Sequence, residues 1–96
     1  FMVGRENAFE YIAAEKNLVA DYLENIEFYP DMSMNHSRLL REESEYWEEL
    51  SDFYKIFLRK GMFLTKLRAN IIINEMEETM EKIILIEQEI INNSLV

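Results

Sequence analysis

Apolar residues recur at intervals of three and four along most of this chain, which is the spacing of one face of an α-helix. The pattern predicts a first helix over about residues 5–29, a second over 38–60 and a third over 63–92. The third helix is dominated by isoleucine, and its expected apolar face consists of Ala69, Ile72, Ile73, Met76, Met80, Ile83, Ile90 and Ile91. On the first helix, one side is expected to carry Ala8, Ile12, Val19, Tyr22, Leu23 and Ile26.

Two junctions separate the predicted helices. Pro30 disfavours a helical residue before it and cannot donate a backbone hydrogen bond, so residues 30–37 are predicted to form a loop. At the second junction, Arg59 and Lys60 complement the negative end of a helix dipole, and Gly61 suits the left-handed position that follows many helices. We therefore expect a break near Gly61, with one long helix across it as the alternative.

The fold class follows from these elements and from the composition. The chain has 96 residues, two glycines, one proline and few alternating polar and apolar stretches, which leaves little room for a sheet. We predict an all-α protein with a single domain over residues 1–96, built as an antiparallel three-helix bundle or a long helical hairpin and completed by oligomerisation.

The third helix carries more apolar surface than one helix of a small monomer needs. Several of its large side chains lie off the apolar face, so a second packing partner is expected, and the simplest partner is another copy of the chain. We expect a homo-oligomer, with a dimer favoured. The expected self-association residues are Ile73, Met80, Ile83, Ile84, Leu85, Ile86, Ile90, Ile91 and Leu95.

Charge and cysteine content limit the classes of function. The formal net charge of −9 works against binding a polyanion or an anionic membrane through the whole surface. The chain has no cysteine, which excludes disulfides and thiolate metal sites and fits a reducing compartment. We expect a cytoplasmic protein that has no cofactor and does not bind membranes, and for which nucleic acid is a disfavoured partner.

One glutamate lies on each predicted apolar face, at Glu15, Glu43 and Glu87. In an up-down-up bundle the last two come to the same end as His36, where two carboxylates and an imidazole could hold a divalent cation or perform acid–base chemistry. The alternative is that these side chains, near the helix termini, reach water or pair with a neighbouring cation, with Lys16 beside Glu15 and Arg41 near Glu43. We favour pairing, because a carboxylate on an apolar face is costly without a partner.

A second acidic pattern consists of Glu45-x-x-Glu48 and, after a helix-length gap, Glu75-x-x-Glu78. It resembles the paired motifs with which all-helical nucleotide pyrophosphohydrolases of the MazG kind hold magnesium, although that family has aspartate where this chain has Glu78. The resemblance implies a magnesium-dependent hydrolase as the enzymatic alternative. The predicted helical phases direct all four carboxylates away from the apolar faces, so we expect a protein that is not an enzyme.

The segment between Asp52 and Glu75 contains no acidic residue. Its aromatic and basic residues are interleaved, and in a folded hairpin they gather at one end. That end could contact an anionic partner, such as a phosphate or an acidic protein surface. The expected contact residues are Lys55, Arg59, Lys60, Lys66 and Arg68.

We therefore expect a non-enzymatic helical interaction protein, an adaptor, regulator or assembly component that self-associates through its C-terminal helix and has a protein partner. The alternative is a small acidic inhibitor of a host nucleic-acid enzyme that imitates nucleic acid; the isoleucine- and asparagine-rich composition suits a phage protein of this kind. A weaker alternative is a nucleic-acid-binding module that uses the basic end.

Overall fold

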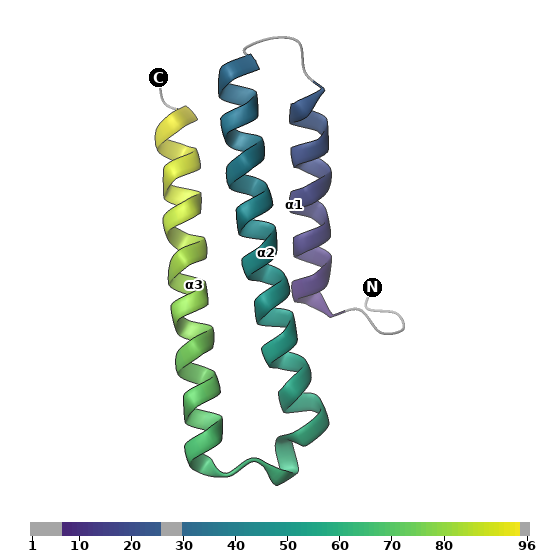
Figure 1. Cartoon of the computed structure of the whole chain (residues 1–96), viewed down its shortest axis with the longest axis vertical. Helices are drawn as coiled ribbons and strands as arrows, with labels where there is room; N and C mark the ends of the chain where they lie inside the picture. The colour runs from purple at the N-terminus through teal and green to yellow at the C-terminus, as the bar shows by residue number, and fades with distance from the viewer. Residues whose placement is uncertain (1–6, 26–29, 95–96) are drawn as a thin grey trace.

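The computed structural model describes residues 7–25 and 30–94, and it is helical almost throughout these ranges. The elements are α1 (Ala8–Glu24), α2 (Pro30–Lys60), the short 3-10 helix η1 (Gly61–Phe63) and α3 (Lys66–Ser94). The predicted all-α, antiparallel three-helix fold is thus confirmed, and α2 and α3 form a hairpin with its break at Gly61 (Figure 1).

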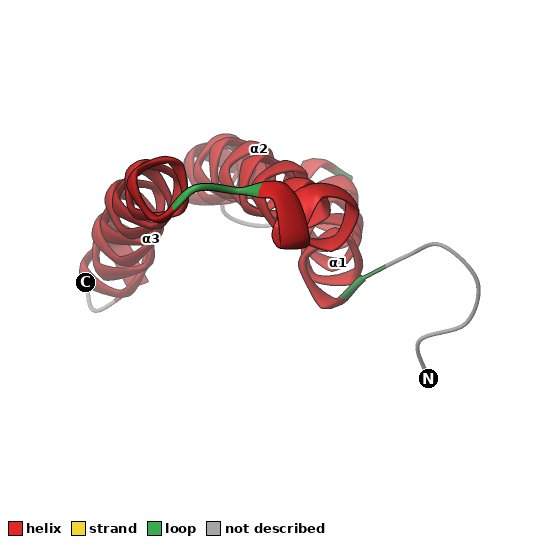
Figure 2. Ribbon diagram, turned by 90° about the horizontal axis from the view of Figure 1, so that it is seen from below, coloured by secondary structure: helices red, strands yellow, loops and turns green. Residues whose placement is uncertain are grey.

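The three helices lie side by side in one curved layer, with α2 in the middle (Figure 2). The Cα trace extends over 52 × 28 × 16 Å, and because the layer is curved its shortest extent exceeds the Cα diameter of one helix, about 5 Å. Within the described residues, α2 packs against both neighbours, whereas the backbones of α1 and α3 do not approach each other. The bundle is therefore open along one long side, between α1 and α3.

The contact between α1 and α2 is a seam of small side chains that recur every seven residues. Ala13 and Ala20 on α1 are buried, as are three serines on α2, Ser37, Ser44 and Ser51. A seven-residue spacing keeps successive side chains on the same face of a helix. Small side chains at these positions let the two helix backbones approach closely.

Hydrogen bonds satisfy the serine hydroxyls of this seam. The Ser44 hydroxyl donates to the backbone oxygen of Ala13 at 3.0 Å and accepts from the side-chain amide of Asn17 at 2.8 Å. The Ser51 hydroxyl accepts from the Asn7 side chain at 2.9 Å. Because Asn7 also caps α1, accepting from the backbone NH of Glu10 at 3.0 Å, the start of α1 is fixed to α2.

An arginine fork closes the other end of the same contact. Arg41 on α2 donates through Nε and Nη2 to the two carboxylate oxygens of Glu24 at 2.8 and 2.7 Å, and Nη2 also lies 2.6 Å from Asp21 Oδ1. Hydrogen bonds from Arg41 and then from Ser37 lower the pKa of Glu24 to about 2. The α1–α2 interface is therefore held by polar groups along its whole length.

The contact between α2 and α3 is apolar by comparison. The buried side chains of α3 include Ile83 and Ile86, while Leu39 and Leu50 are buried on α2. Thr79 is the buried polar member of α3, and its hydroxyl lies 3.2 Å from Glu49 Oε1 and 3.1 Å from the backbone oxygen of Glu75. Lys82 extends over the ring of Tyr46, 5.5 Å from its centroid.

The predicted loop at residues 30–37 was wrong, because this stretch forms the first two turns of α2. Proline interrupts a helix interior but is favoured at the first helical position, where its missing NH would have no partner. The predicted side of α1 was also wrong in part: Ala8, Val19 and Tyr22 are exposed, and Ile26 lies outside the described residues. The face that packs on α2 is instead the small and polar one.

The left-handed conformation expected at Gly61 does not occur either. Its backbone lies outside the left-handed region, and a Cβ built on it would meet no heavy atom within 4 Å. The chain turns here through η1, and Thr65 then caps α3 by accepting from the backbone NH of Arg68 at 3.2 Å.

Replacing Gly61 by alanine should therefore stabilise the protein, because it restricts the unfolded chain without a clash in the folded one. We expect the free energy of unfolding in urea to rise by about 0.5 kcal/mol. A loss of stability in Gly61→Ala would show that the turn needs a conformation that only glycine adopts readily.

Enlarging the small-residue seam should have the opposite effect. Ala20 is 0% exposed, so Ala20→Leu should lower the free energy of unfolding by about 1–3 kcal/mol through overpacking. Ala14→Leu is the matched control, because Ala14 is exposed on the same helix. Equal melting temperatures for the two variants would contradict close packing of α1 on α2.

Candidate functional site

The apolar surplus of α3 forms a second stripe beside the one that packs on α2. Ile73, Met80, Ile84 and Ile91 are 43%, 49%, 51% and 57% exposed. At 100° per residue they lie within an arc of about 40°, roughly a quarter turn from Ile83. We call these four side chains the outer stripe. Successive members are separated by seven, four and seven residues, and together they span about 27 Å of helix.

The other residues expected to mediate self-association lie elsewhere. Ile83 and Ile86 are buried inside the chain's own core and Ile90 is half-buried, so these three do not form an exposed surface. Leu85 is 63% exposed, but it lies about a third of a turn from the outer stripe and lines a cleft between α2 and α3. Leu95 lies outside the described residues. The expected surface therefore narrows to the outer stripe.

An ion network around the buried carboxylate of Glu43 joins all three helices beside this stripe. Lys16 of α1 places its Nζ 3.2 Å from Glu43 Oε2 on α2 and 3.4 Å from Glu87 Oε2 on α3. The indole NH of Trp47 donates to the same oxygen of Glu43 at 2.8 Å, and the ring of Phe9 stacks on Trp47. Lys16 thus bridges the two helices whose backbones do not touch.

Glu43 is the unusual member of the network. Its side chain is 0% exposed, and its second oxygen, Oε1, has no hydrogen-bond partner. Burial raises the pKa of this carboxyl above its ordinary value of 4.5, against the opposing effects of the Trp47 hydrogen bond and the Lys16 charge. The nearby carboxylate of Glu87 acts in the same direction as burial.

The network bears on the expectation of a metal or acid–base site. The structure brings Glu43 and Glu87 close together, but the group between them is the ammonium of Lys16. Across residues 7–25 and 30–94, no three His, Cys, Asp or Glu side chains are arranged to hold a metal ion. Lys16 was expected beside Glu15 and Arg41 near Glu43, but Lys16 pairs with Glu43 and Glu87, and Arg41 pairs with Glu24 and Asp21.

The residues that suggested a pyrophosphohydrolase do not form a site. Glu45, Glu48, Glu75 and Glu78 are all exposed. Within residues 7–25 and 30–94, these four carboxylates belong to no group of three that could hold a metal ion. The spacing in sequence therefore has no counterpart in space.

The basic residues do gather where the hairpin turns. Lys55 is not available there, because it forms an ion pair with Glu10. Arg59, Lys60, Lys66 and Arg68 are exposed, and none of them has a carboxylate partner in the described ranges. Exposed apolar side chains lie among them, namely Leu58, Phe63 and Leu67.

Comparisons of the chain with family models, with curated proteins and with solved structures find no match. No described helix has an apolar stretch long enough to cross a membrane.

The pH dependence of stability tests the state of Glu43. A raised pKa means that the folded protein resists ionisation, so this residue destabilises the wild type increasingly as the pH rises above about 4.5. Glu43→Gln lacks that ionisation, so its unfolding free energy relative to wild type should increase between pH 4.5 and pH 7 in urea titrations.

Glu45→Gln is the matched control, because Glu45 is exposed on the same helix. If the free energy of unfolding of the wild type instead rises relative to that of Glu43→Gln as the pH increases, the attraction of Lys16 outweighs the cost of burying the carboxylate.

Proposed function

We propose that this protein is a non-enzymatic interaction protein, an adaptor, regulator or assembly component, that dimerises through the outer stripe of α3. The observation that carries the proposal is the periodic exposure of Ile73, Met80, Ile84 and Ile91 on one side of α3. Exposed apolar patches that continue along an element are typical of protein-binding surfaces, whereas single exposed apolar residues are ordinary.

The total exposed surface area of the chain also supports a partner that would cover part of it. The chain exposes 7351 Å². A monomeric protein of 11.6 kDa is expected to expose about 5,800 Å². The excess of about 1,500 Å² exceeds the roughly 800 Å² that each partner contributes to a standard interface.

The spacing of the outer stripe favours a second copy as the partner. Pairs of its members lie seven residues apart, at 73 and 80 and again at 84 and 91, which is the repeat of helices that pack along their length. When two copies of α3 run antiparallel about residue 82, Ile73 lies opposite Ile91 and Met80 opposite Ile84. This arrangement is two-fold symmetric, and the two helix dipoles oppose each other.

The dimer can be tested by placing a charge in the stripe. Ile84→Glu should convert the dimer to a monomer, because a buried, unpaired carboxylate at the centre of an apolar interface is strongly unfavourable. Mass measured by light scattering across a concentration series reports the change, and circular dichroism confirms that the helices remain.

Leu85→Glu is the matched control, one residue away on the same helix and 63% exposed, but about 100° around it. We expect this variant to keep the wild-type mass. A wild type that is monomeric at all concentrations would contradict the proposal. Equal dissociation of both variants would contradict the assignment to the outer stripe.

A further inference from the structure

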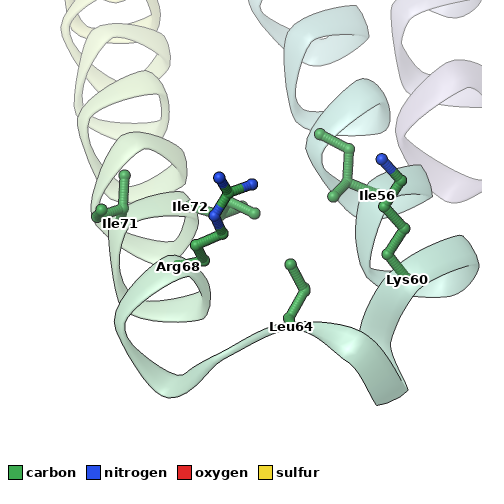
Figure 3. Close-up of a pocket in the computed structure, with 6 residues that line it drawn as sticks. All are labelled: Ile56, Lys60, Leu64, Arg68, Ile71 and Ile72. Carbon is green, nitrogen blue, oxygen red and sulfur yellow. The ribbon is translucent and has the colours of Figure 1, made fainter.

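A cleft of about 430 Å³ lies between α2 and α3 at the end where the hairpin turns. It is lined by Ile56 and Lys60 of α2, by Leu64 of the connection, and by Arg68, Ile71 and Ile72 of α3 (Figure 3). The aliphatic side chains form its walls, and the two cations come from opposite helices. Its volume lies within the range of small-molecule sites, about 300–1,000 Å³.

The two cations of the cleft have no partner within the chain. Neither Lys60 nor Arg68 forms an ion pair among the described residues, whereas Lys16, Arg38, Arg41 and Lys55 all do. No Asp or Glu occurs between Asp52 and Glu75, although the whole chain carries a net charge of −9. Arg68 also lies in the first turn of α3, where a cation is disfavoured by the helix dipole. An anion beside both cations would relieve these unfavourable charges.

The walls and the charges together indicate the chemistry of the ligand. A bare anion would leave the aliphatic walls of the cleft exposed to water, and an uncharged apolar molecule would leave both cations unpaired. A guanidinium matches the two oxygens of a carboxylate. We propose that this cleft binds an aliphatic carboxylate of medium chain length, with its chain against Ile56, Leu64 and Ile72 and its head group between Lys60 and Arg68.

This site is separate from the proposed dimer surface. The cleft and the outer stripe share no residue, and Ile71 lies more than a third of a turn from Ile73 and Ile84 on α3. Ligand binding and self-association can therefore be measured independently. The failure of one proposal would leave the other standing.

Decanoate, below its micellar concentration, is a suitable probe, with binding followed by the methyl resonances of isoleucine and leucine. We expect saturable shifts at Ile56, Leu64, Ile71 and Ile72, and none at Ile84. Decanol, which keeps the chain without the charge, should bind at least tenfold more weakly than decanoate. Butyrate, which keeps the charge with only a short chain, should also bind at least tenfold more weakly.

Charge-neutralising variants then test the head-group site. Lys60→Gln and Arg68→Gln should each weaken decanoate binding about threefold or more, since each removes one partly exposed ion pair. Arg59→Gln and Lys66→Gln are matched controls, because these cations lie at the same end without lining the cleft. All four side chains are exposed, so the helical content should remain unchanged.

Three outcomes would overturn the site. Equal weakening by all four variants would show that decanoate responds only to the general positive charge of this end. Equal affinity for decanol would show that the contact is apolar alone. Binding to anionic phospholipid vesicles without saturable shifts by monomeric decanoate would assign the end to a membrane surface instead.

Discussion

The fold depends on the two different faces that α2 presents to its neighbours. Toward α1 it offers serines at seven-residue intervals, and the alanines of α1 let the backbones approach closely enough for Ser44 to bond the backbone oxygen of Ala13. Toward α3 it presents Tyr46, which lies under Lys82, and Glu49, which contacts Thr79, beside the buried side chains of Ile83 and Ile86. Because α2 separates its neighbours, the helices form an open layer and the outer stripe of α3 stays exposed.

The Lys16 network is what holds the open side in register. A buried carboxylate with one unsatisfied oxygen contributes little net stability, since its desolvation offsets the attraction of the lysine. Such pairs can instead specify an arrangement, because any shift of α1 or α3 along α2 would leave Glu43 buried without a partner. We regard this network as a determinant of helix register beside the proposed dimer surface.

Much of the architecture could be predicted from the sequence, since the three helices and the break at Gly61 follow from apolar spacing and helix-ending residues. The packing face of α1 could not, because Ala13, Asn17 and Ala20 carry no hydrophobic signal; their seven-residue match to the serines of α2 was the available clue. The start of α2 was predicted wrongly because a proline can mark either the end of one helix or the first residue of the next, and Pro30 is the first residue of α2. For the candidate site, the sequence predicts an apolar surplus on α3. It does not predict which isoleucines are exposed and which, like Ile83 and Ile86, are buried, because that depends on how α3 is rotated against α2.

The polar seam of α1 and the apolar seam of α3 also respond to different properties of the solvent. Salt screens exposed ion pairs such as those of Arg41 with Asp21 and Glu24, whereas it leaves the burial of aliphatic side chains largely intact. Cooling acts in the other direction, since apolar burial weakens at low temperature. One small domain thus contains two interfaces with opposite sensitivities, and the helix that loosens first is set by ionic strength and temperature.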